Sequence, residues 1–171
     1  IMQYNISPEK YMGKIGFAGC SVDGVLTGSF KDEDVREYMT KHNAALTPNG
    51  CVWNRDSQGF LPQLMEMMYL DRSKYKKMML EAKQKYEDTN DVEYKKLAVR
   101  YDMIQMAKKI QLNSAYGALG NQWFRWFNSD YAESITMGGQ LSIRWIEAKM
   151  NEFLNKKLKT ENYDYIIASD T

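Results

Sequence analysis

Hydrophobic and polar positions divide this chain into two stretches of different character. In roughly the first 60 residues, seven glycines and two prolines interrupt the apolar runs, which predicts short strands and loops around one helix. From Leu64 onward, no glycine or proline occurs before Gly117, and Met, Leu, Lys, Glu and Tyr dominate. That composition favours long helices in the second stretch.

The helix expected in the first stretch begins near Lys31 and runs through DEDVREYMTKHNAAL, with acidic residues in the first turn, where the helix dipole favours them. The next segment, TPNGCVWNRDSQGFLP, predicts a hairpin. Its CVW run is typical of a strand, RDSQG carries turn residues, and Pro62 marks the next boundary.

The second stretch predicts two helices. MEMMYLDRSKYKKMMLEAKQKYE is the first helix, EDTND is the break, and VEYKKLAVRYDMIQMAKKIQLNSAYGAL is the second helix. Because the connection is so short, we expect the two to form an antiparallel helical hairpin. Leu97, Tyr101 and Ile104 form an apolar stripe on the second helix, which we expect to face the first helix or the body.

A third long helix is expected from Asp130 to Leu158, after a break at GALGN. Gly138 and Gly139 inside it each cost about 1 kcal/mol relative to alanine, so we expect a neighbour, most simply a partner backbone, to pack closely there. The final run YDYIIA predicts a strand that leads to Asp170, and a carboxylate at the end of an apolar strand is a common metal-ligand position.

Four aromatic residues lie close together between the second and third long helices. Large aromatic side chains are usually packed, so we expect this cluster to belong to the core. Its members are Trp123, Phe124, Trp126 and Phe127.

Lys109, Asn113 and Tyr116 occupy positions i, i+4 and i+7 of the second helix. On a helix of about 3.6 residues per turn, their side chains share one stripe within roughly 60°. A lysine charge and an asparagine amide would each need a buried partner in a dry core. The stripe is therefore better suited to contact with a ligand that is anionic and flat.

Arg72 and Lys76 form a second cationic pair, four residues apart on the first helix of the hairpin. Like charges at this spacing repel each other in an isolated helix, whereas a polyanion would make the pair favourable. With Lys109 and Asn113 they would supply a cluster of donors suited to a triphosphate. Taken singly, each of these charges could equally be a solvated surface residue.

Tyr116 and Gly117 also admit two interpretations. A tyrosine face beside a glycine lets a flat partner, such as a base pair, approach the backbone closely. The same dipeptide at a helix end is typical of a packed aromatic residue followed by a C-cap glycine. Both interpretations stay open at the level of the sequence.

Composition limits the function classes without selecting one. The chain has 171 residues and a formal net charge of +1, so no global field attracts nucleic acid or an acidic membrane, and any basic function must be local. Cys20 and Cys51 show no disulfide or metal-type spacing, and no signal peptide or membrane-spanning apolar run is visible, which predicts a cytoplasmic protein. We expect the sequence to be an incomplete piece of a longer protein.

Four segments, in the same order along the chain, resemble DNA polymerases of family B. KKIQLNSAYGALGN has the K-x-x-x-N-S-x-Y-G pattern of the fingers helix in that family, and it is most similar to the replicative enzymes of large tailed, T-even-like bacteriophages. NISPE is similar to the segment after the first catalytic carboxylate motif, and TPNG with RDSQGFLP is similar to the stretch that leads into the fingers. SDT resembles the first half of the D-T-D-S metal motif.

The resemblance implies that one group of residues holds the phosphates of an incoming deoxynucleotide. Its members would be Arg72, Lys76, Lys109 and Asn113. Lys109 would also be placed to donate a proton to the leaving pyrophosphate.

The resemblance implies a second group that contacts the base pair. Tyr116 would lie against the nascent base pair, and Gly117 would give room to the template base. Ile110 and Ser114 would help to wall that pocket. Asp170 would be one ligand of an incomplete Mg²⁺ site, since the family's other metal-binding carboxylates would lie outside this sequence.

The implied fold class is α+β, with the antiparallel helical hairpin as fingers attached to part of a mixed palm subdomain. We expect residues 1–63 to be a palm-side segment, 64–120 the fingers hairpin, and 121–171 the palm helix with the first strand of the metal-motif hairpin. The implied partners are primer–template DNA, deoxynucleoside triphosphates and a sliding clamp, with no membrane, and this piece alone is expected to be inactive. The alternative is a non-enzymatic helical module that binds nucleic acid or a protein.

Overall fold

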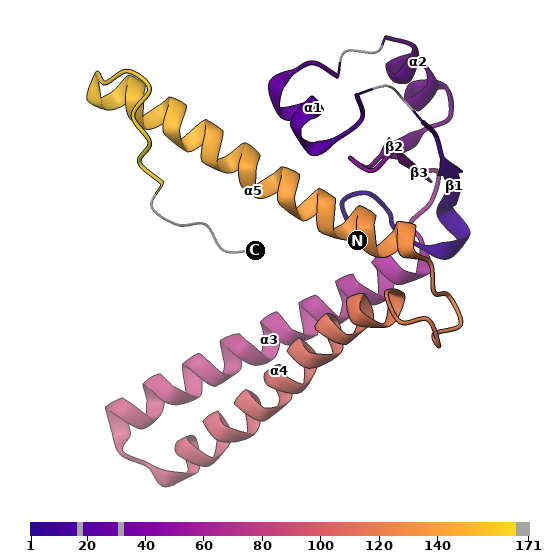
Figure 1. The fold of residues 1–171 in the computed structure, drawn as a ribbon. Coiled ribbons are helices and arrows are strands. Elements are labelled where there is room, and N and C mark those ends of the chain that lie inside the picture. The colour runs from indigo at the N-terminus through magenta and orange to yellow at the C-terminus, as the bar shows by residue number, and fades with distance from the viewer. Residues whose placement is uncertain (17–18, 31–32, 167–171) are drawn as a thin grey trace.

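The computed structural model describes residues 1–16, 19–30 and 33–166, in which a small sheet accompanies two short and three long α-helices (Figure 1). The elements in chain order are η1 (Pro8–Lys10), β1 (Tyr11–Lys14), α1 (Val22–Thr27), α2 (Glu33–Lys41), β2 (Ala44–Leu46), β3 (Cys51–Asn54), α3 (Phe60–Thr89), α4 (Val92–Leu119) and α5 (Ser129–Leu158). The fold is mixed α+β and mostly helical, as the sequence predicts. No helix in this described part is both long and apolar enough to cross a membrane.

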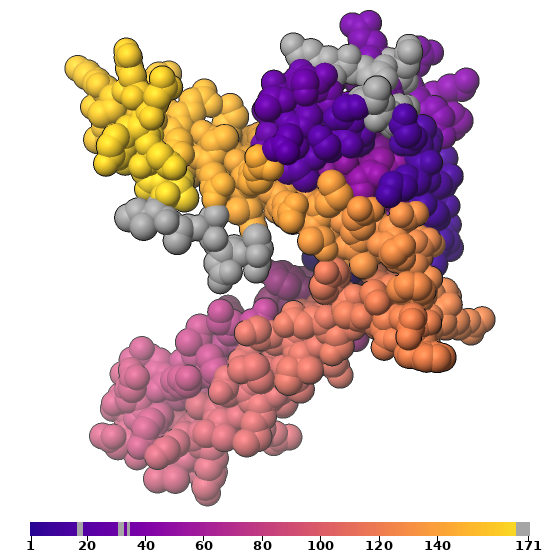
Figure 2. All heavy atoms as spheres, viewed as in Figure 1, coloured from indigo at the N-terminus to yellow at the C-terminus, as the bar shows by residue number. Residues whose placement is uncertain are grey.

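α3 and α4 form the expected antiparallel hairpin, which projects from the body of the molecule as a separate arm (Figures 1 and 2). Asn90 ends α3 in the left-handed conformation at φ 54°, and the Asp91 side chain accepts a hydrogen bond from Glu93 N at 2.9 Å. The break therefore takes only these two residues. On α4, Tyr101 lies toward α3 with its ring 6.2 Å from that of Tyr75, as expected for the apolar stripe.

α3 begins earlier than the predicted Met65 because distant side chains cap it. Its N-cap, Gly59, has no side chain, and the backbone amides of its first two residues donate instead to Glu9 Oε1 at 2.7 Å and to Ser7 Oγ at 3.3 Å. Pro62 lies inside the first turn, where its missing N–H is tolerated. Pro62 therefore does not mark the helix boundary that the sequence predicts.

The sheet has three antiparallel strands in the order β1-β3-β2. β2 and β3 form a hairpin, but its turn is residues 47–50 rather than the predicted RDSQG. Gly50 makes this turn possible, because its φ is +83° and a Cβ there would lie 2.8 Å from Ile15 O. RDSQG instead leads into α3.

The first stretch of the described chain contains two α-helices, so the prediction of one helix there is wrong. α1 is short, begins after the capping residue Ser21 and ends at Gly28, which has φ 69°. α2 ends before Asn43, whose positive φ of 42° stops a right-handed helix. The following run, predicted as helix, is therefore strand β2. The predicted helix start near Lys31 lies outside the described residues.

α5 matches the third predicted helix to within one residue at its start. Asn128 caps it, with Oδ1 accepting a hydrogen bond from Asp130 N at 2.8 Å. At Gly138 the close neighbour is the Tyr4 ring rather than a partner backbone, because a Cβ there would lie 2.9 Å from Tyr4 Cε2. A Cβ at Gly139 would meet nothing within 4 Å, so packing requires only the first of the two glycines.

The core lies where the sheet, the base of the hairpin and the start of α5 meet. Trp53 is fully buried there, with its ring 5.2 Å from the rings of both Tyr11 and Tyr131. Leu119, the last residue of α4, is fully buried in the same cluster, so the base of the hairpin is part of the core. Burial of each such large side chain contributes about 2 kcal/mol to stability.

The aromatic cluster after α4 is largely exposed, so its prediction as core is wrong. Of its four residues, only Phe124 packs against the buried cluster. Trp123 is 87% exposed, and Trp126 and Phe127 are exposed as well. A tight turn, in which Phe124 N donates to Asn121 O at 2.9 Å, lets one ring reach the core while its neighbours face solvent.

The strand predicted at YDYIIA is not formed in its described part. Residues 163–166 are irregular and are attached to α5 by Asn151 and Asn155. Residues 167–168 of this run lie outside the described residues, and so does Asp170 with its predicted metal role.

Gly138→Ala should lower the free energy of unfolding, whereas Gly139→Ala should raise it. The first change adds a methyl group against the Tyr4 ring, and overpacking of this kind costs about 1–3 kcal/mol. The second replaces a helical glycine that borders open space, which gains about 0.5–1 kcal/mol. Denaturant titrations of both variants would measure the difference, and equal stabilities would contradict the packing assigned to Tyr4.

Candidate functional site

The predicted stripe lies on one continuous helix. Lys109, Asn113 and Tyr116 are all exposed residues of α4, which is unbroken over their whole length. Tyr116 is 42% exposed, and its hydroxyl lies 2.9 Å from Thr136 Oγ1 on α5. This contact holds the ring against α5 while part of the ring stays open to solvent.

The other predicted residues of α4 are exposed too. Ile110 is 59% exposed, and Ser114 and Gly117 also face solvent. A Cβ at Gly117 would meet nothing within 4 Å, so the space beside the helix is open there. α4 continues past Gly117 to a cap at Gly120, which excludes the interpretation of Gly117 as a C-cap.

Arg72 and Lys76 lie on α3, the neighbouring helix of the hairpin. Lys76 is exposed, whereas Arg72 is half-buried and its Nε has no hydrogen-bond partner among the described residues. An unpaired buried donor costs about 1–3 kcal/mol, so an anion that reached this guanidinium would bind favourably.

An ion pair across the hairpin indicates which way these residues face. Lys108 Nζ lies 3.1 Å from Asp71 Oδ2 and joins the two helices along one side. Arg72 follows Asp71 on α3 and Lys109 follows Lys108 on α4, and each step rotates the side chain by about 100° around its helix. Because the two helices are antiparallel, the two rotations are mirror images. They carry Arg72 and Lys109 together to the side of the hairpin opposite the ion pair. Lys76 follows Arg72 by about one turn and belongs to the same stripe of α3. Helical geometry therefore puts the Arg72–Lys76 pair of α3 and the Lys109 stripe of α4 on a common side of the hairpin.

A hollow of about 320 Å³ opens between α4 and α5 beside Tyr116. It is lined by Tyr116, Ile135, Thr136, Gly139, Gln140 and Ile143. Thr136 Oγ1 donates to Ala132 O at 3.0 Å, so the Tyr116 hydroxyl is the donor in the contact between the two side chains. The sequence did not reveal Thr136, because its place beside Tyr116 depends on how two helices pack.

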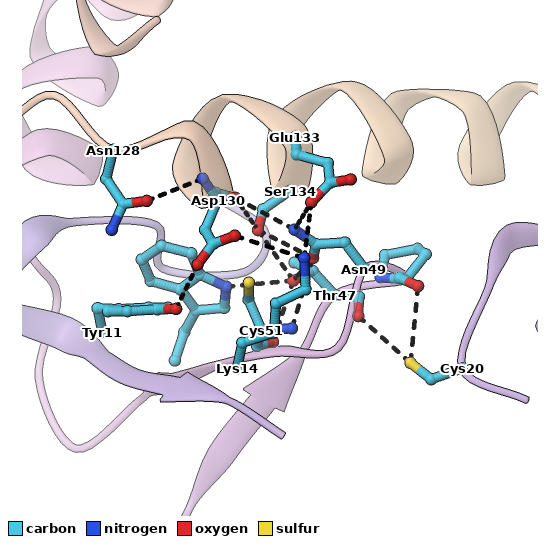
Figure 3. Close-up of polar contacts among 12 residues, drawn as sticks. Tyr11, Lys14, Cys20, Thr47, Asn49, Cys51, Asn128, Asp130, Glu133 and Ser134 are labelled. Atoms are coloured by element: carbon cyan, nitrogen blue, oxygen red, sulfur yellow. Dashed lines mark hydrogen bonds and ion pairs between the residues drawn. The ribbon is translucent and has the colours of Figure 1, made fainter. Parts of the chain in front are cut away.

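A polar network joins the turn at residues 47–50 to the first turns of α5 (Figure 3). Asn49 Nδ2 donates to Asp130 O at 3.2 Å and to Glu133 Oε2 at 3.1 Å. Ser134 Oγ lies 3.1 Å from Thr47 Oγ1 and 3.0 Å from Asn49 Oδ1. These contacts fix the start of α5 against the sheet.

Lys14 and Tyr11 of β1 complete this network (Figure 3). Lys14 Nζ lies 3.0 Å from Glu133 Oε2, and the Tyr11 hydroxyl donates to Asp130 Oδ2 at 2.8 Å. Hydrogen bonds from Lys14 and Asn49 lower the pKa of Glu133, and the Glu133 contact raises the pKa of Lys14. Burial, together with the Asp130 carboxylate, raises the pKa of Tyr11, so the phenol keeps its proton and donates it.

The NISPE segment also has a role that the sequence did not reveal. Asn5 Nδ2 donates to Asn54 O at 2.7 Å, and Asn5 Oδ1 accepts from Gly59 N at 2.8 Å. Ser7 and Glu9 cap the first turn of α3. The segment therefore positions the start of the hairpin, and the polar side chains at positions 5, 7 and 9 are its only local signal.

Mg²⁺, the ion that the family resemblance implies, finds no ligand set in the described part of the chain. Among those residues, no three His, Cys, Asp or Glu side chains come together to hold a metal ion. Asp130 and Glu133 already accept hydrogen bonds from neighbouring side chains. Asp170 lies outside the described residues. The described residues therefore do not fit the ion.

Comparison with known proteins decides the family. The family model described as DNA polymerase family B matches residues 1–169. The chain belongs to DNA polymerase family B. All three long helices lie inside the matched region. The Arg72–Lys76 pair of α3 and the Lys109 stripe of α4 therefore lie inside it too.

Similar family members occur in phages and archaea. The DNA-directed DNA polymerases of Enterobacteria phage T4 and Escherichia phage RB69 are each 28% identical to this chain over 218 residues, an alignment that covers 100% of the chain and 23% and 22% of those relatives. DNA polymerase 1 of Pyrococcus abyssi is 35% identical over 126 residues, which covers 74% of the chain and 15% of that relative. The chain thus spans less than a quarter of the length of these relatives.

Glu133→Gln should remove a pH-dependent part of the free energy of unfolding. The contacts with Lys14 and Asn49 hold the pKa of Glu133 below its ordinary value of 4.5, so the carboxylate stabilises the fold above that pH. This contribution is lost as the pH falls through the lower pKa of the folded state. The stability difference from wild type should be less than about 1 kcal/mol near neutral pH, since both partners are half-exposed. It should shrink in acid, as the pH falls below 4.5 and then through the lowered pKa of the folded state.

Lys14→Met is the matched variant, because it removes the cation and leaves the carboxylate. Denaturant titrations in the range from about pH 3 to about pH 7 should show a smaller acid dependence for Lys14→Met, and the double variant should add little to either single change. A stability difference for Glu133→Gln that persists undiminished in acid would contradict its origin in the ion pair.

Proposed function

We propose that this chain forms the fingers and part of the palm of a DNA-directed DNA polymerase, and that its hairpin binds the incoming deoxynucleoside triphosphate. The observation that carries the proposal is the unbroken, solvent-facing stripe of α4 in a chain of family B. In this proposal residues 64–120 are the fingers, and residues 1–63 and 121–171 are palm segments.

The phosphate end of the proposed site comprises Lys109 and Asn113 on α4 with Arg72 and Lys76 on α3. A planar guanidinium suits two phosphate oxygens at once, and lysines add mobile point charges. Lys109 has no ion-pair partner among the described residues. Because charge builds up on the leaving pyrophosphate during phosphoryl transfer, a lysine there stabilises the transition state and can donate a proton.

The base end of the proposed site comprises Tyr116 and Gly117, bordered by Ile110 and Ser114. The hydrogen bond to Thr136 already holds the Tyr116 ring, so a base pair that packs against the ring costs little further side-chain entropy. The open space beside Gly117 leaves room for the template base. The two ends of the site thus recognise different parts of one nucleotide.

The substrates and partners belong to the complete protein. We propose primer–template DNA and deoxynucleoside triphosphates as substrates, with closure of the hairpin over the nucleotide as a lid-type motion. A sliding clamp as partner and the host-cell cytoplasm as location rest on the family relationship alone.

In the polymerase encoded by the complete gene, Lys109→Ala should lower the maximal rate of nucleotide incorporation by about 10²-fold, a typical loss for a general acid that also stabilises charge. Lys108→Ala is the matched control. This adjacent lysine pairs with Asp71 on the other side of the hairpin, so its loss should change the rate by less than about threefold. Arg72→Ala should act mainly on the apparent affinity for the nucleotide.

Rapid-quench measurements of single-nucleotide incorporation at increasing nucleotide concentration would separate the maximal rate from the affinity. An unchanged maximal rate for Lys109→Ala would remove its role as the acid. Equal losses for the Lys108 and Lys109 variants would contradict the side of the hairpin assigned to each.

A further inference from the structure

An apolar row of side chains runs along α4 on the side of that helix opposite α3. Val99 and Met103 lie two positions before and after Tyr101, so they are rotated by about 200° around the helix axis from the ring that packs toward α3. Val92 and Met106 continue this row toward the two ends of α4. We call Val92, Val99, Met103 and Met106 the α4 apolar stripe.

The α4 apolar stripe is exposed over its whole length. Val92 is 58% exposed, Val99 49%, Met103 68% and Met106 44%. A single exposed apolar residue is ordinary on a protein surface, but a continuous row of them on one helix face indicates an interaction surface. The stripe covers about 21 Å of the helix axis, and its steps of seven, four and three residues are those of a coiled-coil seam. A seam of this kind is narrow and fits a second helix.

Cations border the α4 apolar stripe on both edges. Lys95 and Arg100 are exposed on opposite edges of it, and Arg100 has no ion-pair partner among the described residues. Lys96 lies in the row itself and pairs with Glu93 at 2.7 Å. Asp102, the next charge on the Lys95 edge, is half-buried and already accepts a hydrogen bond. The seam therefore favours a partner with acidic residues opposite Lys95 and Arg100.

The same charges disfavour a second copy of this chain as the partner. An antiparallel pairing that sets Val99 opposite Met103 would place Arg100 beside Arg100 of the second copy. A parallel pairing would place Lys95 beside Arg100 of the second copy, and Lys96 beside its own counterpart. Like charges repel each other in both orientations, so a different, acidic sequence suits the stripe better.

A membrane surface is also a poorer match to this stripe. Helices that lie in a membrane interface typically present a large apolar face with Trp, Phe or Leu. The α4 apolar stripe is narrow and consists of Val and Met alone.

We propose that the α4 apolar stripe docks an acidic amphipathic helix of a partner protein. The apolar face of that helix packs on the valines and methionines, and its acidic residues pair with Lys95 and Arg100. Methionine side chains suit this role because they are flexible and adapt to the surface that covers them. α4 belongs to the arm that projects from the body, so a partner helix can lie along it (Figures 1 and 2). This inference does not depend on the proposed nucleotide site.

The test uses the polymerase encoded by the complete gene and two synthetic peptides, each about three heptads long. Both carry Leu at the a and d positions, while the acidic probe has Glu at e and g and the basic probe has Lys there. Fluorescence anisotropy of the labelled probes would measure their affinities. The acidic probe should bind at least about tenfold more tightly than the basic probe at low salt, because only its charges complement Lys95 and Arg100.

Three variants show whether the stripe itself binds the probe. Met103→Glu should weaken the acidic probe by about tenfold or more, because it puts a negative charge in the seam. Met67→Glu is the matched control, since Met67 is 61% exposed on α3 and lies outside the stripe, and it should change the affinity by less than about twofold. The double change Lys95→Glu and Arg100→Glu should reverse the preference in favour of the basic probe. Because all these side chains are exposed, the variants should keep the circular dichroism of the wild type.

Several outcomes would overturn the proposal. These are no binding of the acidic probe, equal affinities of the two probes, and equal effects of Met103→Glu and Met67→Glu. Self-association of the polymerase that Met103→Glu abolishes would identify a second copy as the occupant instead. Binding to phosphatidylserine vesicles that the same change abolishes would identify a membrane instead.

Discussion

The direction of the hairpin depends on a capping interaction between distant parts of the chain. Glu9 and Phe60 are 51 positions apart in the sequence, and Ser7 and Leu61 are 54 positions apart. Ser7 and Glu9 accept the hydrogen bonds of the first α3 amides, which a local cap would otherwise have to satisfy. Gly59 is needed there because a Cβ would lie 2.6 Å from Ser7 Cβ. At the other end of the hairpin, Leu119 is fully buried. With both ends fixed to the body, the fold determines where Lys109 can reach.

The long helices could be predicted from the sequence because their signals are local. The bounds of α4 and the spacing of Lys109, Asn113 and Tyr116 follow from composition and helical period alone. The link from Tyr116 to Thr136 could not be predicted, because it joins two helices across a loop. The facing of Arg72 also became clear only from a tertiary contact between the two helices of the hairpin.

Predictions failed where a distant partner or a single backbone angle decides the outcome. The α3 start was placed too late because its caps lie near the N-terminus. The helix predicted through residues 44–46 ends earlier because Asn43 adopts a positive φ. Hydrophobicity predicted burial of Trp123, but the turn at Asn121 directs only Phe124 into the core. At Gly138 the prediction of close packing is correct, but the neighbour that packs there is the Tyr4 ring and not the predicted partner backbone.

α4 joins the two ends of the candidate site as one stiff rod. Lys109 and Tyr116 are seven residues apart, about 10.5 Å along the axis, with no glycine or proline between them. The hydrogen bond from Tyr116 to Thr136 ties the Tyr116 end of the rod to α5. In the proposed site, the rod transmits a shift of Tyr116 to Lys109, so the fit of the base and the position of the phosphate-binding lysine are linked.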